Sequence, residues 1–378
     1  MVKFFLVLVF AVFFCAGDSF ANSDYLDDVY KKLNIDGRLM IDSGNVIKGK
    51  NSKLKDETAI RRAWLGTSGK FNDDWFYRGL FAFEDEDINL VDVFVGYNGI
   101  KNSEIIMGHL IENNGVDANT INLISPFIER SDAFSTFRKL RRLGVSYNYY
   151  QSAIAAKIGV FGSGVGDNAK LVDKGESVSG RVYGLVFNDE EKYHNLHLGF
   201  NSSYRNQQSQ NRGLRYKTIG NAKVIKASPL DSGFINEVND YQNYGLEIRY
   251  QKGPFSVIGE YFKTLVDRKT SNLDFESSYI LASYFVTGHK YQYDLKAGGP
   301  NDIVNKEGAI ELVARYSKVG LNHRDIRGGK VNSYDLGVNY YVNKNVKLML
   351  NYIYSDLEGS PITNDNPQYL MTRLQFWF

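Results

Sequence analysis

Alternation of apolar and polar residues recurs along nearly the whole chain, in segments of roughly ten residues separated by polar or glycine-rich turns. Such a period of two places successive side chains on opposite faces of a β-strand. A soluble β-sandwich would give the same pattern in any one segment. Its recurrence without a convincing long helix favours a closed sheet that is apolar outside and polar inside. The clearest segments are residues 91–97, 142–149, 244–251, 334–342 and 346–352.

Composition agrees with a sheet that faces lipid. The 378 residues include 26 Tyr, 24 Phe and 35 Gly but only 6 Pro. The mean hydropathy of −0.33 excludes a helical membrane protein, because spanning helices need runs of about 20 apolar residues. In a transmembrane β-barrel only alternate residues meet lipid, and aromatic side chains form girdles at both interfaces. A soluble sandwich could share this composition, so the two ends of the chain are needed to decide.

The N-terminus has the pattern of a secretory signal peptide. Lys3 precedes an apolar stretch, residues 4–16, that is too short to span a membrane, and Ser19-Phe20-Ala21 supplies small residues for cleavage. We expect residues 1–21 to be a signal peptide, cleaved after Ala21. The single cysteine, Cys15, lies in the segment to be removed, so the mature chain should gain no stability from disulfides.

The C-terminus predicts an amphipathic final strand over residues 369–378. Leu374, Phe376 and Phe378 share one phase, and Arg373 and Gln375 occupy the other. A last strand of this kind that ends in Phe looks like the recognition signal of outer-membrane barrels. An export signal at one end and this strand at the other together favour such a barrel over a soluble edge strand.

Residues 22–378 are therefore predicted to form a single all-β domain, a transmembrane antiparallel β-barrel with pore-constricting loops. A strand crosses the hydrocarbon in about 9–11 residues. With alternating short turns and longer loops, about 20–22 residues per strand gives about 16 or 17 strands. Even counts are preferred in single-chain bacterial barrels, so we expect 16, which is wide enough for an aqueous channel.

Two stretches are predicted to be loops because they are polar and irregular. Residues 115–139 contain Pro126, the only proline of the N-terminal half, and could fold into the pore. Residues 201–243 carry a run of basic side chains before the first acid at Asp231. That run suits either a solvated external loop, with lipopolysaccharide phosphates as a partner, or a basic lumen wall.

Blocks along the mature chain resemble the phosphate-selective porin O and P family. Ile60 to Gly66 (IRRAWLG) resembles an early strand motif of that family, and the later blocks follow in the expected order. These are residues 91–97, 126–131, 141–145, 250–262, 284–288, 308–317 and 337–352. The resemblance implies a trimer of 16-stranded barrels in which loops narrow each pore and a ladder of arginines leads small anions, phosphate among them, to a lysine-lined constriction.

Carried over by motif, the family's functional residues fall on ten positions. In a regular strand, adjacent Arg61 and Arg62 cannot both face the lumen. The block after Arg215 departs from the family, with Thr218-Ile219-Gly220 where Arg-Pro-Glu is usual. The ladder candidates are Arg61, Arg62, Arg142, Arg215 and Lys217. The constriction candidates are Asp92, a lumen carboxylate; Glu129 and Arg130, which could brace the loop as an ion pair; and Lys296 and Lys306.

No arrangement of residues predicts catalysis, a metal site or a cofactor. Of the five histidines only His194 and His197 are close, and this spacing is a poor metal signal without a third ligand. Gly162-Ser163-Gly164 is not a nucleophile elbow. We expect a porin without enzymatic activity and without a nucleic-acid partner. The formal net charge of +2 does not argue for anion selectivity. A weakly selective diffusion porin, or a structural barrel with loop-mediated binding, therefore stays open.

Overall fold

The computed structural model describes residues 33–84, 88–138, 141–165, 175–207, 213–226, 228–363 and 365–378. The predicted signal peptide, residues 1–21, lies outside the described residues. Within those residues, no helix has the length and apolarity to cross a membrane.

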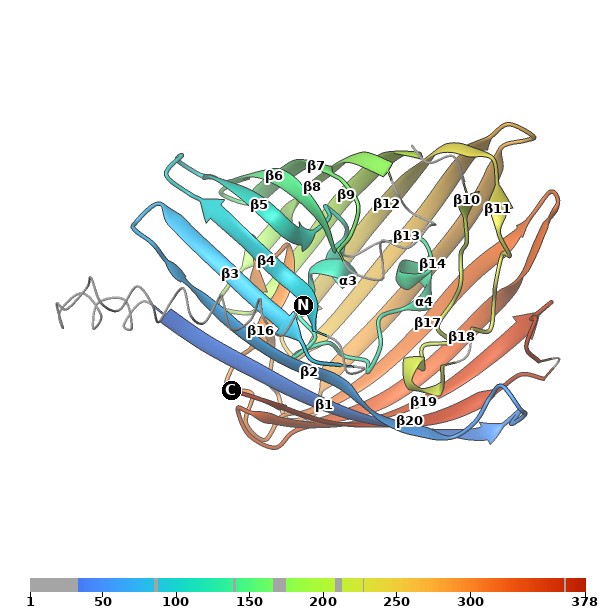
Figure 1. Ribbon diagram of the computed structural model, residues 1–378. Coiled ribbons are helices and arrows are strands. Elements are labelled where there is room, and N and C mark those ends of the chain that lie inside the picture. Colours follow the sequence, from blue (N-terminus) through green and yellow to red (C-terminus); the bar gives the residue numbers. More distant parts are fainter. Residues whose placement is uncertain are drawn as a thin grey trace, which may run out of the picture.

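The described chain forms a closed barrel of 16 strands, in which every strand is antiparallel to its neighbours and β20 pairs with β1 (Figure 1). The predicted all-β architecture and strand number are confirmed. The barrel strands are β1 (Leu33–Lys48), β2 (Glu57–Lys70), β3 (Trp75–Ala82), β4 (Asn89–Tyr97), β5 (Ser103–Ile111), β6 (Arg141–Gln151), β7 (Ile154–Phe161), β8 (Gly175–Asp189), β9 (His194–Gln207), β12 (Val238–Lys252), β13 (Phe255–Arg268), β14 (Leu273–Phe285), β17 (Ile310–His323), β18 (Ile326–Tyr341), β19 (Val346–Glu358) and β20 (Gln368–Trp377).

Period-two alternation determines which side chains face outward. On β18, Leu336 and Val338 are exposed on the outside, whereas Asp335 and Asn339 on either side of them are buried inside. Toward one end of the barrel, tyrosines of three adjacent strands form an outer row. The ring centroids of Tyr316 and Tyr334 are 5.1 Å apart. The ring of Tyr354 follows, 6.0 Å from that of Tyr334. Such a row is what an aromatic girdle requires.

The two ends of the barrel differ. Both described termini lie at one end, where Arg38 pairs with Trp377, and most connections there are short, such as residues 71–74 and 152–153. We call this the turn end. The connections at the opposite loop end include the long segments 112–140 and 208–237.

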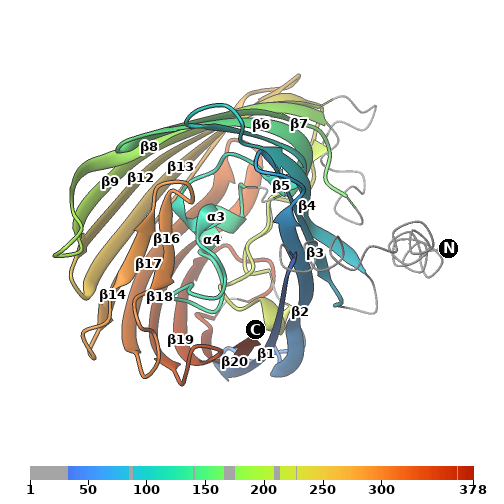
Figure 2. The same cartoon turned by 90° about the vertical axis from the view of Figure 1, so that its left-hand side faces the viewer.

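Three connections fold into the barrel interior. The inward loop, residues 112–138, carries α3 (Val116–Asn119) and α4 (Asp132–Ser135), and both helices lie inside the ring of strands (Figure 2). The long-loop segment, residues 213–226 and 228–237, carries β10 (Gly213–Leu214), η3 (Lys223–Ile225) and β11 (Ile235–Asn236). From the turn end comes the inward hairpin, residues 286–309, with β15 (Tyr291–Asp294) and β16 (Gly299–Ile303).

Apolar packing fixes the inward loop against one side of the wall. Phe134 and Phe137 of the loop pack with Tyr216 of the long-loop segment and with Phe262 and Phe275 of the wall. Burial of aromatic rings stabilises such contacts by roughly 1.5–3 kcal/mol per side chain. On its other side, the loop therefore borders the space along the opposite wall, which is built from β1, β2 and β4.

The prediction that residues 201–243 are a loop throughout is wrong at both ends. Residues 201–207 continue β9, and residues 238–243 begin β12, with regular pairing between them. The misleading feature is polarity on the outward face, at Ser202 and Asn206. Both positions flank the exposed Tyr204, so polar and aromatic side chains alternate with each other on this outward face.

A buried ion pair joins the first and last strands. Arg373 of β20 donates to both carboxylate oxygens of Asp42 of β1, at 2.6 and 2.7 Å, and both side chains are almost fully buried. Since Arg373 otherwise has only Glu129 among the described residues, with Nη2 3.7 Å from Oε1, removal of Asp42 leaves a buried charge that is largely uncompensated.

We expect Asp42→Ala to lower the stability of the folded barrel by about 3–5 kcal/mol, because Arg373 would stay buried without its bidentate partner. The measurement is the temperature at which the folded band converts to the unfolded band on a semi-native gel. Asp274→Ala is the control, since the exposed pair Lys263–Asp274 is worth at most about 1 kcal/mol. Equal losses in the two variants would contradict this assignment.

Candidate functional site

A β-bulge turns two adjacent arginines of β2 toward the lumen. Met40 of β1 is opposite Arg62, but the next residue, Ile41, is opposite Ile60, so Arg61 is the extra residue on β2. A bulge of this kind bends the strand and re-aims side chains. Arg61 contacts the inward loop and Arg62 contacts buried Met40. The regular-strand expectation, under which only one of the two could face the lumen, is therefore corrected.

Arg61 binds the tip of the inward loop. Its Nε and Nη2 donate to Glu129 Oε1 and Oε2 at 2.6 and 3.2 Å, and Arg373 Nη2 lies 3.7 Å from Glu129 Oε1. Burial alone would raise the pKa of the Glu129 carboxyl, but the neighbouring guanidinium groups of Arg61 and Arg62 outweigh burial and hold this pKa well below its usual range. Glu129 therefore carries a negative charge where the inward loop meets the wall.

The expected ion pair between Glu129 and Arg130 is wrong. Arg130 turns back into its own loop, where it contacts Asp117, with Nη1 3.3 Å from Oδ1, and donates from Nη2 to the Thr120 carbonyl at 3.1 Å. Glu129 therefore reaches the wall while Arg130 closes the loop.

Three guanidinium groups surround the indole of Trp64 on β2. The guanidinium carbons of Arg38, Arg62 and Arg141 lie 5.0, 5.4 and 5.9 Å from the ring centroid. Each distance is within the range of a cation–π attraction, worth roughly 0.5–2 kcal/mol. The indole Nε1 donates to Glu84 Oε1 at 2.5 Å, which fixes the ring. Trp64 thereby allows cations from β1, β2 and β6 to lie close together.

Carboxylates neutralise part of this positive charge. Asp92 accepts two hydrogen bonds from Arg141, at 2.7 and 2.9 Å, so it orients this arginine. Asp36 pairs with Arg78 and lies 3.7 Å from Arg38. A second bulge, at Val91 of β4, aligns Asp92 with Leu80 and brings it to the lumen.

Arg62 differs from its neighbours because no carboxylate in the described part of the chain forms an ion pair with it. It is 9% exposed, its Nη1 contacts only the Met40 sulfur at 3.5 Å, and its Nε has no hydrogen-bond partner. Leaving a buried charged donor unsatisfied costs about 1–3 kcal/mol or more. Such a group is suited to receive an anion from the lumen.

Lys223 of η3 adds another positive charge. The side chains that follow it, Val224 and Ile225, pack on β1 where Gly44 leaves room, since a side chain at Gly44 would lie 2.9 Å from each of them. The turn η3 packs against β1 and β2, and the Arg61 guanidinium, and then burial, lower the pKa of the Lys223 ammonium group. We refer to Arg38, Arg61, Arg62, Arg141 and Lys223 as the basic cluster.

The other candidate residues lie outside the basic cluster. Arg142 is 2% exposed on β6 and its Nε is 3.7 Å from Glu112 Oε2. Arg215 and Lys217, 45% and 43% exposed, share Asp231 near the loop end. Toward the turn end, Lys296 on the inward hairpin lies 5.5 Å from the Tyr150 ring. Lys306 lies 5.4 Å from the Trp377 ring and 3.1 Å from Asp302.

Sequence reasoning missed three members of the basic cluster and its aromatic centre. Arg38 was hidden in the inward phase of the first strand, and Lys223 within a long basic run. Arg141 and Trp64 stood inside motif blocks that were already marked, beside Arg142 and Arg62. The available signal was an arginine next to an arginine that was already marked. The distances between side chains on β1, β2 and β6 could not be obtained from the sequence.

Histidines do not assemble with acids into a metal site among the described residues. His197 lies fully buried inside, 2.8 Å from the Tyr293 hydroxyl through Nδ1. His194, three residues earlier, contacts Tyr250 on the outward phase of β12 at 3.2 Å. The two rings therefore face opposite sides of the wall, as strand geometry requires.

Comparison with known proteins agrees with the barrel and with the family that the sequence resembles. The family described as "Phosphate-selective porin O and P" matches residues 33–378. Porin O of Pseudomonas aeruginosa is 25% identical over 370 residues, which cover 87% of this chain and 84% of that protein.

Solved structures share the architecture. The anion-selective porin from Comamonas acidovorans superposes with a TM-score of 0.60 at 12% identity, over 92% of this chain and 99% of that one. OmpT of Vibrio cholerae, in a trimer form, superposes with a TM-score of 0.58 at 15% identity, over 92% and 99% of the two chains. At these identities the likeness shows the fold alone.

Proposed function

Because the chain belongs to the phosphate-selective porin O and P family, and is thus an outer-membrane porin and a non-enzymatic channel, we propose that it conducts small anions passively, with phosphate as the preferred solute. By the asymmetry of such barrels, the turn end is periplasmic and the loop end extracellular. Solutes would then pass from the loop end, past the inward loop, to the turn end.

The observation that carries this proposal is the un-neutralised Arg62 within the basic cluster. A pore that favours anions must replace part of the hydration shell with hydrogen-bond donors and maintain a positive potential along the path. The planar guanidinium group meets phosphate oxygens two at a time and stays charged at every relevant pH. Arg62 offers these donors beside Arg61, next to the loop that borders the lumen.

The exposed cations at the loop end would collect anions before they reach the basic cluster. Arg215 and Lys217 outnumber the single Asp231 that they share, so this patch keeps a positive charge. Such charges increase the rate of encounter with solutes of opposite sign, and salt weakens the effect. The lysines Lys296 and Lys306 would act at the turn end, where solutes leave.

Two partners belong to the same proposal. We infer a homotrimer, supported by the fold that the chain shares with the trimeric OmpT form. Outward-facing lysines just beyond the tyrosine row, Lys318 and Lys330, lie at the level where phosphorylated lipid headgroups, including those of lipopolysaccharide, would meet the wall.

A weakly selective diffusion porin is the second candidate, and a specific observation favours it. Most buried lumen arginines are already paired with carboxylates, so the wall as a whole carries little free charge. The pairs are Arg61–Glu129, Arg141–Asp92, Arg181–Glu247, Arg315–Asp335 and Arg373–Asp42. Under this alternative, the solute is chosen by size and not by charge.

Titration of the chloride current with phosphate separates the two candidates. Purified protein in a planar bilayer is bathed in KCl, and phosphate is added at constant ionic strength. We expect saturable block at phosphate concentrations well below that of chloride, because bidentate donors bind the phosphate more tightly. A current that changes only in proportion to bulk conductivity would refute the anion site and leave the diffusion porin.

A further inference from the structure

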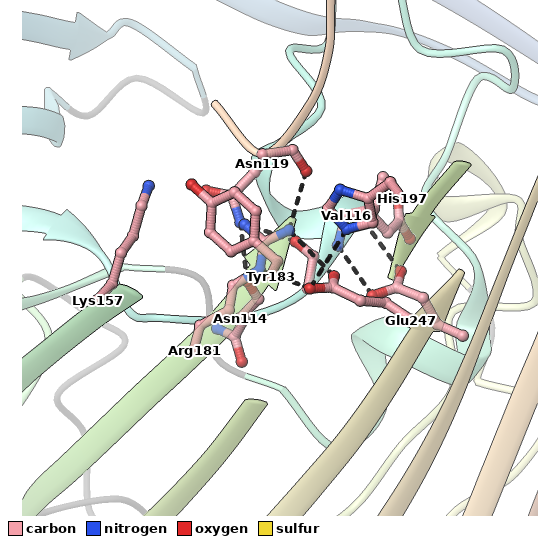
Figure 3. A network of polar contacts seen from close by, with 12 residues as sticks. Asn114, Val116, Asn119, Lys157, Arg181, Tyr183, His197 and Glu247 are labelled. Atoms are coloured by element: carbon pink, nitrogen blue, oxygen red, sulfur yellow. Dashed lines mark hydrogen bonds and ion pairs between the residues drawn. The ribbon is translucent and has the colours of Figure 1, made fainter. Parts of the chain in front are cut away.

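The inward loop and the inward hairpin enter the barrel from opposite ends and meet on the same part of the wall. Val116 of α3 packs beside Gly299 of β16, where an added side chain would lie 3.3 Å from Val116 Cγ1. Figure 3 shows this place, with Val116, His197 and Glu247 close together and Arg181 beside them. The wall here comes from β8, β9, β12 and β13, opposite the strands that carry the basic cluster.

A single carboxylate holds the first part of the inward loop. Glu260 of β13 accepts hydrogen bonds from the backbone amides of Val116 and Asp117, both at 2.9 Å, and from the Tyr279 hydroxyl at 2.6 Å. Three donors thus converge on this one side chain. The loop accordingly begins its path through the lumen from a fixed point.

Gly115 makes this contact sterically feasible. A side chain at that position would place its first carbon 1.8 Å from Glu260 Oε1 and 2.9 Å from Glu247 Oε2. Any other residue would force the loop away from both carboxylates. The loop thus approaches the wall as closely as backbone can.

The neighbouring carboxylate holds the hairpin. Glu247 of β12 accepts from Arg181 Nε and Nη2 at 2.8 and 3.0 Å, and the same Nη2 donates to the Gly298 carbonyl at 2.9 Å. His197 adds a second link, since its Nε2 is 3.6 Å from Glu247 and its Nδ1 is 2.8 Å from the Tyr293 hydroxyl.

These two glutamates are directly opposite each other in the β12–β13 register. Two acidic side chains at opposed positions do not stabilise a sheet, so the wall gains nothing from this arrangement by itself. We propose that the acidic pair, Glu247 and Glu260, is a positioning device that fixes the inward loop and the inward hairpin against one wall, and so keeps the passage along the basic cluster open. This role goes beyond the selectivity proposed above.

Glu260→Ala removes the acceptor for both amides, and Gly115→Ala displaces the loop while leaving the wall unchanged. For each variant we expect a severalfold rise in open-channel current noise and frequent partial closures in symmetric KCl, because the released loop would move into the passage. The reversal potential in a KCl gradient should stay as in the wild type, since the basic cluster is intact. Glu260→Gln, which keeps one acceptor oxygen, should restore part of the quiet current.

Glu104→Gln is the matched control, because this lumen carboxylate bonds only to the wall residues Asn148 and Tyr150 among its contacts in the described chain. Its current should remain quiet. Folding is checked by the gel-mobility shift, and Gly115→Ala keeps the test valid if Glu260→Ala does not fold. Steady, wild-type currents in Gly115→Ala and Glu260→Ala would overturn the positioning role. This readout does not depend on whether the wild-type channel prefers anions, so the two proposals fail separately.

Discussion

Replacement of Arg62 by alanine is expected to raise the phosphate concentration for half-maximal block roughly ten- to a hundredfold. Hydrogen bonds to a charged group contribute about 1.5–3 kcal/mol, and each 1.4 kcal/mol is a factor of about ten. Arg62 has no ion pair to lose, so the change should act on the solute and not on the barrel. The measurement is the phosphate titration of the chloride current in single channels.

The matched control for Arg62 is Arg215→Ala. Arg215 is exposed and shares Asp231 with Lys217, so its removal leaves a cation at the loop end. For Arg215→Ala we expect less than about a threefold change in the phosphate concentration for half-maximal block. The change should occur mostly at low salt, where exposed charges are screened least. If the two variants changed the phosphate concentration for half-maximal block equally, the basic cluster would have no special role.

Glu129→Gln is expected to have the opposite effect, with phosphate block at a roughly tenfold lower concentration and a smaller phosphate current. The carboxylate neutralises Arg61 through two hydrogen bonds, and without it the cluster gains one positive charge within reach of Arg62. Charges about 4 Å apart at a protein surface interact by about 4 kcal/mol, and a fraction of that energy gives the expected shift. A more tightly bound phosphate leaves the site more slowly. Because conduction requires sites that release the solute readily, the phosphate current would fall.

The pH dependence checks the same assignment. The pKa of Glu129 is held well below its usual range, so the charge persists as pH falls and is lost only below that lowered pKa. We therefore expect the wild-type chloride selectivity to be constant down to about pH 5, below which ordinary carboxyl groups begin to protonate. A rise in chloride selectivity between pH 7 and 5 that is absent from Glu129→Gln would show that Glu129 titrates normally.

The strand count and the inside–outside pattern could be predicted because both follow from local chemistry. Alternation along Tyr334 to Val342 determines its outward face regardless of distant neighbours. The loop boundaries around residue 201 could not be predicted in the same way. There, polar Ser202 faces outward on a regularly paired strand, and the sequence does not show where strand pairing ends.

The candidate site was predictable by residue type but not by arrangement. Arg61 and Arg62 were marked by their motif, yet a bulge defined by the β1–β2 register places both inside. The Trp64 contacts join strands whose proximity depends on closure of the barrel. Partner choice was likewise non-local, since Glu129 bonds to Arg61, 68 positions away, and not to its neighbour Arg130.

The reversal potential of the wild-type channel under a KCl gradient tests the central claim most directly. If the basic cluster sets the potential of the passage, the current should reverse close to the equilibrium potential of chloride, and Arg62→Ala should move it toward zero. A reversal potential at zero, or on the potassium side, would contradict an anion-selective pore.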